Sequence, residues 1–249
     1  MLAQGMLDVE RYADAAREAE RALKVSPSDA AALAALAAAR YVTGDEKGFD
    51  EARARALAIN PRDAGFFVTL AEAAGRVRRY ATAAEFARQA IVADPARSKA
   101  HSVLGMNLLR LGKIAEGRQS LETAFKGDPY DVWVKNTLDL LDTFKNYDES
   151  SSEHVGFMIE KQESALLSVY LKDLAEEAYR KFQQRYQYTP PPPIRIEVYR
   201  SHADFSVRTV GLAGIGALGV SFGTTLAFDS PAAKDAGPFN WASTVWHEL

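Results

Sequence analysis

The sequence predicts an all-α superhelix of helix-pair repeats, followed by a smaller α+β domain. Prolines recur at a spacing of 34 residues, at Pro27, Pro61, Pro95 and Pro129, and this period is typical of repeats built from two helices. Short alternating segments around one amphipathic helix follow after residue 154. The polar stretch 146–153 separates the two patterns. We therefore expect domains over residues 1–145 and 146–249.

Composition excludes several classes of function. The chain has 249 residues, 47% of them hydrophobic, and 30 Lys and Arg against 33 Asp and Glu, without a basic block. Nucleic-acid binding is therefore not expected. The absence of Cys excludes disulfides, thiolate metal sites and a Cys nucleophile, and leaves the compartment open. No signal peptide is recognisable, and the uncharged run 209–228 contains five glycines, so we expect no membrane span.

Small side chains recur where the two helices of a pair must approach closely. They are Ala15 and Ala22, Ala83 and Ala90, Gly117 and Ala124, and at a third position Ala3, Ala37, Ala71 and Gly105. Leu23, Leu57, Ile91 and Phe125 would fill the seam between repeats, and each proline would end its helix.

These residues resemble the tetratricopeptide repeat, over about residues 1–130. Phe49 departs from the pattern, because a small residue is expected there, so this pair is predicted to be splayed or repacked. The first repeat lacks most of its first helix, and we expect the chain to begin inside a longer array. The resemblance implies a concave face that binds a peptide or partner protein. A rigid spacer for the second domain is the alternative.

The next elements follow from periodicity. Residues 131–144 are predicted to form a helix that caps the last repeat, 155–159 a strand, and 163–186 a long helix. The apolar stripe of this helix is predicted at Leu166, Leu167, Tyr170, Leu171, Leu174, Ala178 and Phe182. Residues 190–193 are a proline connector, 195–199 a strand, and Ser201 caps a short helix through Phe205.

Gly214, Gly216 and Gly219 fit the spacing G-x-G-x-x-G of dinucleotide-binding proteins. That motif requires a helix immediately after the glycines, so that the helix N-terminus meets the pyrophosphate. Residues 220–228 are instead β-branched and aromatic, which predicts a strand or hairpin. No dinucleotide cofactor is expected.

Helical periodicity restarts at residues 239–249, after Gly237-Pro238, and this helix carries His247 and Glu248. In the motif H-E-x-x-H, two His on one helix face ligate zinc, and the Glu beside the first polarises the metal-bound water. The sequence contains the first half of this motif. The second His would fall four positions after His247, so we interpret the site as severed.

The C-terminal half resembles the peptidase MA-like metallohydrolases of the gluzincin group, bacterial proteins that often carry tetratricopeptide repeats. The matching residues are Phe205, Arg208-Thr209, Gly216-Ala217, Gly219-Val220, Phe222-Gly223, Ser230-Pro231, Asn240-Trp241 and His247-Glu248. The resemblance implies a zincin-like domain in which His247 binds zinc and Glu248 is the general base. His101, His154 and His202 are the other His, without ligand spacing. This chain is expected to be inactive and to bind no zinc tightly.

Two hypotheses about function follow. The parent protein is a zinc metallopeptidase with repeats for protein–protein interaction, or it is a non-enzymatic scaffold with an inactive peptidase-like module. In the first hypothesis, Gly219, Val220 and Ser221 form a sheet edge that takes an extended substrate as an added strand. The alternative is that the glycine-rich stretch 216–223 forms a tight hairpin, which needs its glycines only for its own turn.

Overall fold

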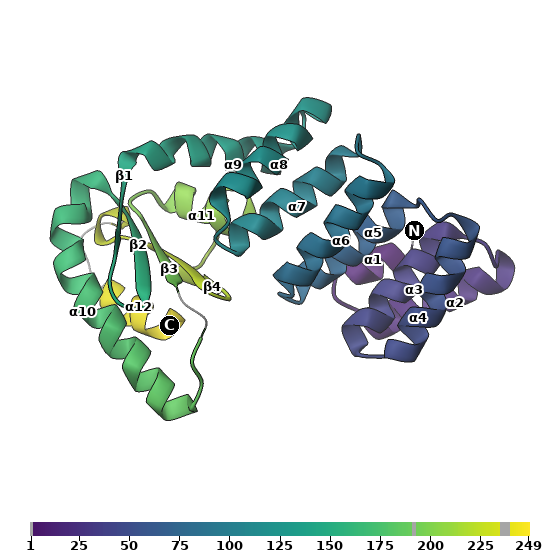
Figure 1. The fold of residues 1–249 in the computed structure, drawn as a ribbon, viewed down its shortest axis with the longest axis horizontal. Coiled ribbons are helices and arrows are strands. Elements are labelled where there is room, and N and C mark those ends of the chain that lie inside the picture. Colours follow the sequence, from purple (N-terminus) through teal and green to yellow (C-terminus); the bar gives the residue numbers. More distant parts are fainter. Residues whose placement is uncertain (1, 191–192, 235–239) are drawn as a thin grey trace. The chain divides into compact units, whose positions relative to one another are not determined.

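The computed structural model describes residues 2–190, 193–234 and 240–249 (Figure 1). The chain divides into two compact units, Met1–Leu109 with Lys113–Pro129, and Arg110–Gly112 with Tyr130–Leu249. Residues 191–192 of the proline connector and residue 239 of the last predicted helix lie outside the described residues. Among the helices of the described ranges, none is long and apolar enough to cross a membrane.

The N-terminal unit consists of helices that follow one another as antiparallel pairs. They are α1 (Leu2–Asp8), α2 (Tyr12–Val25), α3 (Ala30–Thr43), α4 (Glu46–Ile59), α5 (Ala64–Arg76), α6 (Tyr80–Ala93), α7 (Ser98–Arg110) and α8 (Ile114–Gly127). The helices α2, α4, α6 and α8 each end two residues before a repeat proline, which confirms the predicted helix ends. This unit is therefore a tetratricopeptide-like region of helix-pair repeats.

Aspartates start the first helices of successive repeats. The carboxylates of Asp29 and Asp63 accept hydrogen bonds from backbone N–H groups in the first turns of α3 and α5. Asp45 caps α4 in the same way. Such caps satisfy donors that have no partner inside the helix, and they fix where each helix begins.

The predicted seam of small residues is buried. Ala83 and Ala90 are fully buried between the helices of their repeat. At Gly105 a Cβ would lie 2.6 Å from Leu121 Cγ and 2.9 Å from the carbonyl oxygen of Gly117. The backbones of α7 and α8 thus approach so closely that a side chain does not fit. The structure confirms that small residues permit this packing.

Phe49 shows how the second repeat accommodates its large residue. The ring of Phe49 is half-buried and lies 5.7 Å from the ring of Tyr41, and Tyr41 meets Phe86 edge-on at 5.6 Å. The preceding residue, Gly48, is the buried small one. The pair α3–α4 is therefore repacked around an aromatic cluster and not splayed.

The C-terminal unit contains a five-stranded sheet with strand order β1-β2-β3-β5-β4. Its elements are α9 (Val132–Thr143), η1 (Phe144–Asn146), β1 (Tyr147–Ser151), β2 (Val155–Glu160), α10 (Lys161–Tyr186), β3 (Ile194–Tyr199), α11 (His202–Val210), β4 (Gly219–Phe222), β5 (Thr225–Asp229), η2 (Pro231–Ala233) and α12 (Trp241–Glu248). The strands β2, β3 and β5 are parallel, whereas β1 and β4 are antiparallel edges.

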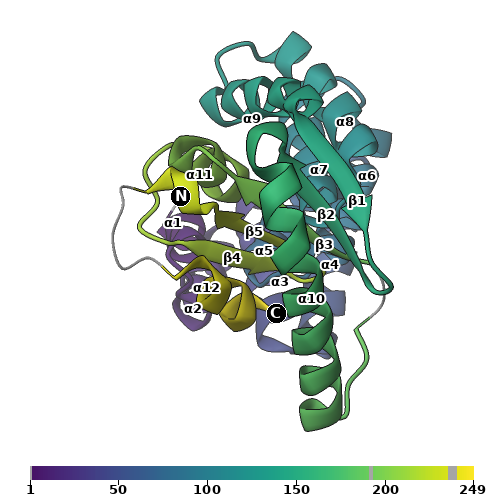
Figure 2. The ribbon, with the colours of Figure 1, turned by 90° about the vertical axis from the view of Figure 1, so that its left-hand side faces the viewer.

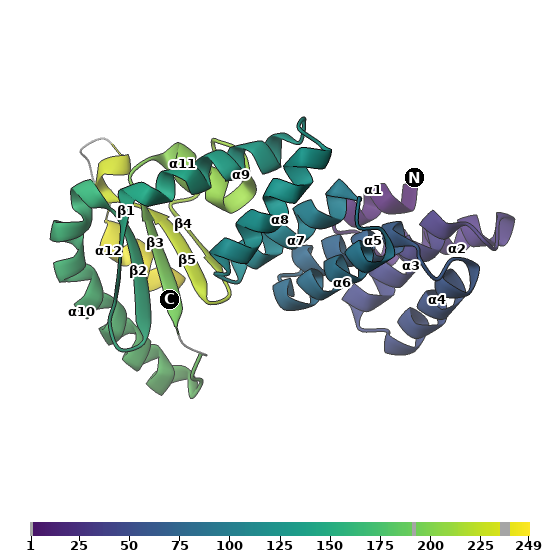
Figure 3. The ribbon, with the colours of Figure 1, turned by 45° about the horizontal axis from the view of Figure 1, so that its top comes forward.

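Helices cover both faces of this sheet (Figure 2 and Figure 3). On one face, α10 and α12 pack on the alternating apolar residues of the central strands, including Phe157, Ile196 and Phe228. On the other face α11 packs on β3 and β5, and α9 packs on α11. A Cβ at Gly211, which ends α11 with φ of +77°, would lie 2.4 Å from Trp133 Cδ1 of α9. Helices thus cover both faces of the sheet.

Three sequence predictions need correction here. The stretch 146–153 was expected to be a boundary, but most of it is the edge strand β1, paired with β2 from Tyr147 to Ser151. The helix α9 groups with the C-terminal unit, so the boundary lies at Tyr130 and not at residue 145. On α10, Leu166 and Tyr170 of the predicted stripe are exposed, while Ala175 and Tyr179 are buried. Leu167, Leu171 and Ala178 of the stripe are buried as predicted, so periodicity located the helix and most of its buried face.

Candidate functional site

The helix α12 places His247 and Glu248 in its last turn. The Asn240 side chain accepts a hydrogen bond from Ser243 N and starts the helix. Val245 is fully buried against the sheet and α10, and the Trp246 ring lies 5.6 Å from that of Phe182. Packing of these two residues fixes the rotation of α12. His247 is exposed and Glu248 is half-buried at the edge of the sheet.

Glu248 lies against the edge strand β4. A Cβ at Gly219 would stand 2.8 Å from Thr244 Cγ2 and 2.9 Å from Glu248 Cγ. The glycine therefore lets α12 approach the strand, a role that neither the substrate-edge nor the turn interpretation gave it. The turn of the β4–β5 hairpin uses Gly223 instead, at φ of +68°.

The predicted substrate edge is the outer side of β4. Gly219, Val220 and Ser221 pair with β5 on one side, and no described strand pairs with them on the other. A hollow of about 380 Å³ opens beside this hairpin and Glu248. Its lining includes the aromatic side chains of Tyr179, Phe182, Tyr186 and Tyr188. Glu248 is the charged side chain among the lining residues.

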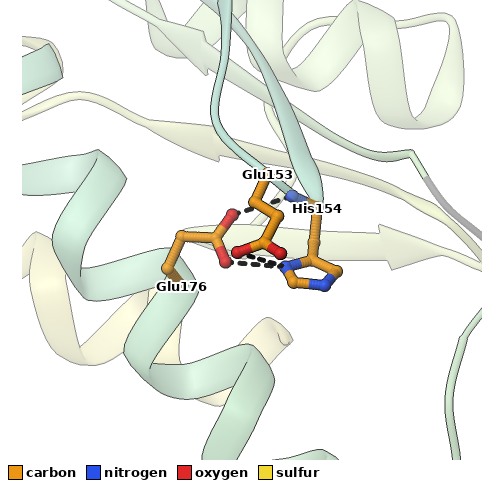
Figure 4. Close-up of side chains that lie close together, drawn as sticks. All are labelled: Glu153, His154 and Glu176. Carbon is orange, nitrogen blue, oxygen red and sulfur yellow. Dashed lines mark hydrogen bonds and ion pairs between the residues drawn. The ribbon is translucent and has the colours of Figure 1, made fainter.

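The described residues do not fit a zinc ion at His247. A zinc site needs at least three protein ligands, and α12 supplies one imidazole and the neighbouring carboxylate. In the described ranges, the group of three ligand side chains that lie within 4.8 Å of one another is Glu153, His154 and Glu176, without His247 (Figure 4). The zinc-binding role of His247 and the general-base role of Glu248 therefore stay predictions.

The group in Figure 4 is a hydrogen-bond network that ties the β1–β2 turn to α10. Glu176 Oε1 accepts from His154 N at 2.9 Å, and Glu176 Oε2 lies 2.9 Å from His154 Nδ1. Glu176 Oε1 also accepts from Ser152 Oγ at 2.5 Å. The imidazole also stacks on Tyr179 at 4.3 Å. Burial alone would raise the pKa of Glu176, but these hydrogen bonds and the nearby imidazole lower it to about 2.

A second buried network joins α11 to the sheet. Glu197 is fully buried on β3 and accepts hydrogen bonds from Arg208 Nε at 2.6 Å, Arg195 Nε at 2.9 Å and Tyr199 Oη at 2.8 Å. Burial opposes ionisation of Glu197, but the two guanidinium groups hold its pKa below the ordinary value. This network holds α11 in place. Alternation in the strand placed Glu197 on a face, but nothing in the sequence indicated its partners.

The repeat unit has a hollow of its own, formed by α1, α2 and α3, which we call the α1–α3 hollow. Its volume is about 350 Å³. The apolar lining residues are Leu2, Ala3, Ala22, Val25, Ala31 and Ala32, and the polar ones are Gln4, Glu18, Arg21 and Asp29. Leu2 and Val25 are 62% and 88% exposed. Apolar side chains combined with polar groups are typical of protein–protein contact surfaces.

No protein-family model matches this chain, and neither does any curated protein. Among solved structures, the chain is similar to Pseudomonas aeruginosa PilF, with 26% identity and a TM-score of 0.44, over 58% of this chain and 65% of that one. The chain thus spans about two thirds (65%) of the length of PilF.

Two further structures illustrate the range of this similarity. A thermophilic tetratricopeptide protein of Thermus thermophilus is 23% identical, with a TM-score of 0.44, over 75% of this chain and 93% of that one. The first tetratricopeptide domain of Spaghetti (RPAP3), bound to an HSP90 peptide, is 18% identical, with a TM-score of 0.39, over 46% and 90%. Because these TM-scores are below 0.5, the repeat assignment depends on the period and helix pairs of this chain.

Proposed function

We propose that this protein is an interaction scaffold whose helix-pair repeats bind a peptide segment of a partner protein. The observation that carries the proposal is the α1–α3 hollow. It combines exposed Leu2 and Val25 with charged lining residues of both signs, Glu18, Arg21 and Asp29. An apolar side chain of the partner would fill the hollow, and the charged residues would hold polar groups of the peptide backbone.

A displayed library of random peptides, selected on the intact chain, tests this proposal. We expect enriched peptides to share a large apolar residue. Val25→Asp should reduce binding of these peptides at least about tenfold, which corresponds to roughly 1.4 kcal/mol. Val92→Asp is the matched control, because Val92 is 79% exposed at the end of α6 and is not among the residues that line the hollow. Equal loss in both variants, or no enrichment, would exclude the hollow as the binding site.

Zinc-dependent peptide hydrolysis is a second candidate function. The supporting observation is the contact of Glu248 with the edge strand β4, because the resemblance implies that a catalytic helix lies beside such an edge. The described residues do not complete a metal site, so this candidate requires ligands from a longer product of the same gene. In that case Gly219, Val220 and Ser221 would hold an extended substrate.

Zinc analysis distinguishes the two candidates. We expect the 249-residue chain to retain less than one zinc per chain after dialysis, because one imidazole is a weak ligand set. A gene product with a His four positions after His247 should retain one zinc, and Glu248→Gln should keep the metal but lose hydrolysis. Full hydrolytic activity of Glu248→Gln would exclude Glu248 as the base.

A further inference from the structure

A pocket opens at the carboxyl ends of the parallel strands β2 and β3. The helix α10 follows β2 directly and lies on one face of the sheet, whereas α11 follows β3 and lies on the other. Figure 2 and Figure 3 show the two helices leaving the sheet on opposite sides. When two neighbouring strands lead into helices on opposite faces, a crevice forms at the strand ends, and α/β proteins commonly bind ligands there.

This strand-end pocket has a volume of 440 Å³. It is lined by Thr143, Asn146, Tyr147, Glu160, Arg200, Ser201, Asp204 and Ala232. Most of these side chains are polar. They come from the ends of α9, η1, β2 and β3, from the starts of β1 and α11, and from η2. A small polar ligand would therefore meet groups held by several rigid elements.

The charges in the pocket are of both signs. Glu160 Oε2 already accepts a hydrogen bond from Gln162 N at 2.9 Å. Asp204 is half-buried, and its carboxylate accepts no hydrogen bond from the described residues. Arg200 donates from Nη1 to Gln162 Oε1, and its guanidinium has further N–H groups.

Both carboxylates of the pocket affect the phenol of Tyr147. Burial raises the pKa of Tyr147, and the charges of Asp204 and Glu160 raise it further, so both carboxylates act on this phenol. Burial also raises the pKa of Asp204. A cation beside Asp204 would replace the hydration that burial removes from this carboxylate.

We propose that the strand-end pocket binds the backbone groups of a free α-amino acid. The ammonium group lies between Asp204 and Glu160, and the carboxylate is bound by Arg200. Ammonium and carboxylate are the two groups that complement this arrangement of charge, and the volume admits a molecule of that size. The pocket shares no lining residue with the α1–α3 hollow and includes no residue of α12, so the proposal does not depend on the proposed partner binding.

Three small probes test this site, L-alanine and its two halves, ethylamine and propionate. Amide chemical shifts of the intact, isotope-labelled chain are followed while each probe is added up to about 50 mM. We expect L-alanine to shift the amides of Tyr147 and residues 201–204, ethylamine to shift them at higher concentration, and propionate to leave them unchanged. Asp204→Asn should abolish the response to both amines. Arg200→Gln should weaken L-alanine to the level of ethylamine.

Glu177→Gln is the control variant, because Glu177 is an exposed residue of α10 that pairs with Lys181 and is not a lining residue. It should behave as the unchanged chain. Thermal unfolding of all variants shows whether they are folded. No shift with L-alanine in the folded unchanged chain overturns the proposal, as does propionate binding alone or an L-alanine response that Arg200→Gln does not change.

Discussion

At the scale of residues, two buried carboxylates, Glu176 and Glu197, organise hydrogen-bond networks in the C-terminal unit. Glu176 and Glu197 are each held by several donors, and each retains a pKa below the ordinary value despite burial. Glu176 on α10 accepts from Ser152 and His154 in the β1–β2 turn, and Glu197 on β3 accepts from Arg208 of α11, so each carboxylate connects a helix to the sheet. The sequence did not reveal these roles, because a Glu within a helix or strand looks like a solvated residue until its partners are known.

Glu176→Gln should destabilise the C-terminal unit by roughly 1–3 kcal/mol, since the amide loses the charge-assisted contact with His154. The folded-state pKa of about 2 lies below the ordinary value of 4.5. This contribution is therefore present above about pH 4.5 and is lost as the pH falls towards 2. Denaturant unfolding at pH 7 and pH 3 should show the difference between the two proteins shrinking at low pH. A constant difference would contradict this role.

At the scale of elements, local patterns predicted most helices and strands but not their contacts. The proline period located the ends of the helix pairs, and Ser201 caps α11 as predicted, although α11 extends to Val210. The hairpin after Gly219 confirms that G-x-G-x-x-G does not start a helix here. The strand β1 was missed because its polar residues lie on an exposed edge, where no apolar alternation is required.

Gly105→Ala should overpack the seam between α7 and α8 and destabilise the repeats by roughly 1–3 kcal/mol. A new Cβ would meet backbone as well as Leu121, so the neighbours cannot simply turn away. Gly5→Ala in α1 is the control, because no atom lies within 4 Å of a Cβ there. It should be neutral or stabilising by up to about 1 kcal/mol. Thermal unfolding measures both, and a stabilising Gly105→Ala would disprove the close approach.

Gly219→Val should displace α12 from the edge strand, because its side chain would collide with Thr244 and Glu248. We expect the free energy of unfolding to fall by roughly 1–3 kcal/mol. Tryptophan fluorescence should shift to the red, since α12 contains Trp241 and Trp246. Gly216→Val is the matched control, with open space around its Cβ. Unchanged fluorescence and stability in Gly219→Val would instead favour an open edge that accepts a substrate strand.

At the scale of the whole molecule, the proposed sites fall in two different units. The repeats contain the surface suited to a partner, and the sheet unit contains the strand-end pocket and the helix with His247 and Glu248. Proline spacing identified the first unit from sequence alone. The lining of the α1–α3 hollow could not be predicted in this way, because it combines residues of three helices whose exposure depends on how they pack.

Hydrogen–deuterium exchange of the intact chain with a selected peptide tests the central claim most directly. If the repeats bind the partner, the peptide should slow exchange in Leu2–Asp8, Tyr12–Val25 and Ala30–Thr43, and Val25→Asp should remove this protection while Val92→Asp retains it. The sheet unit should exchange as before. Protection confined to β4 and α12 would contradict the claim, because it would place the peptide beside Glu248 and not on the repeats.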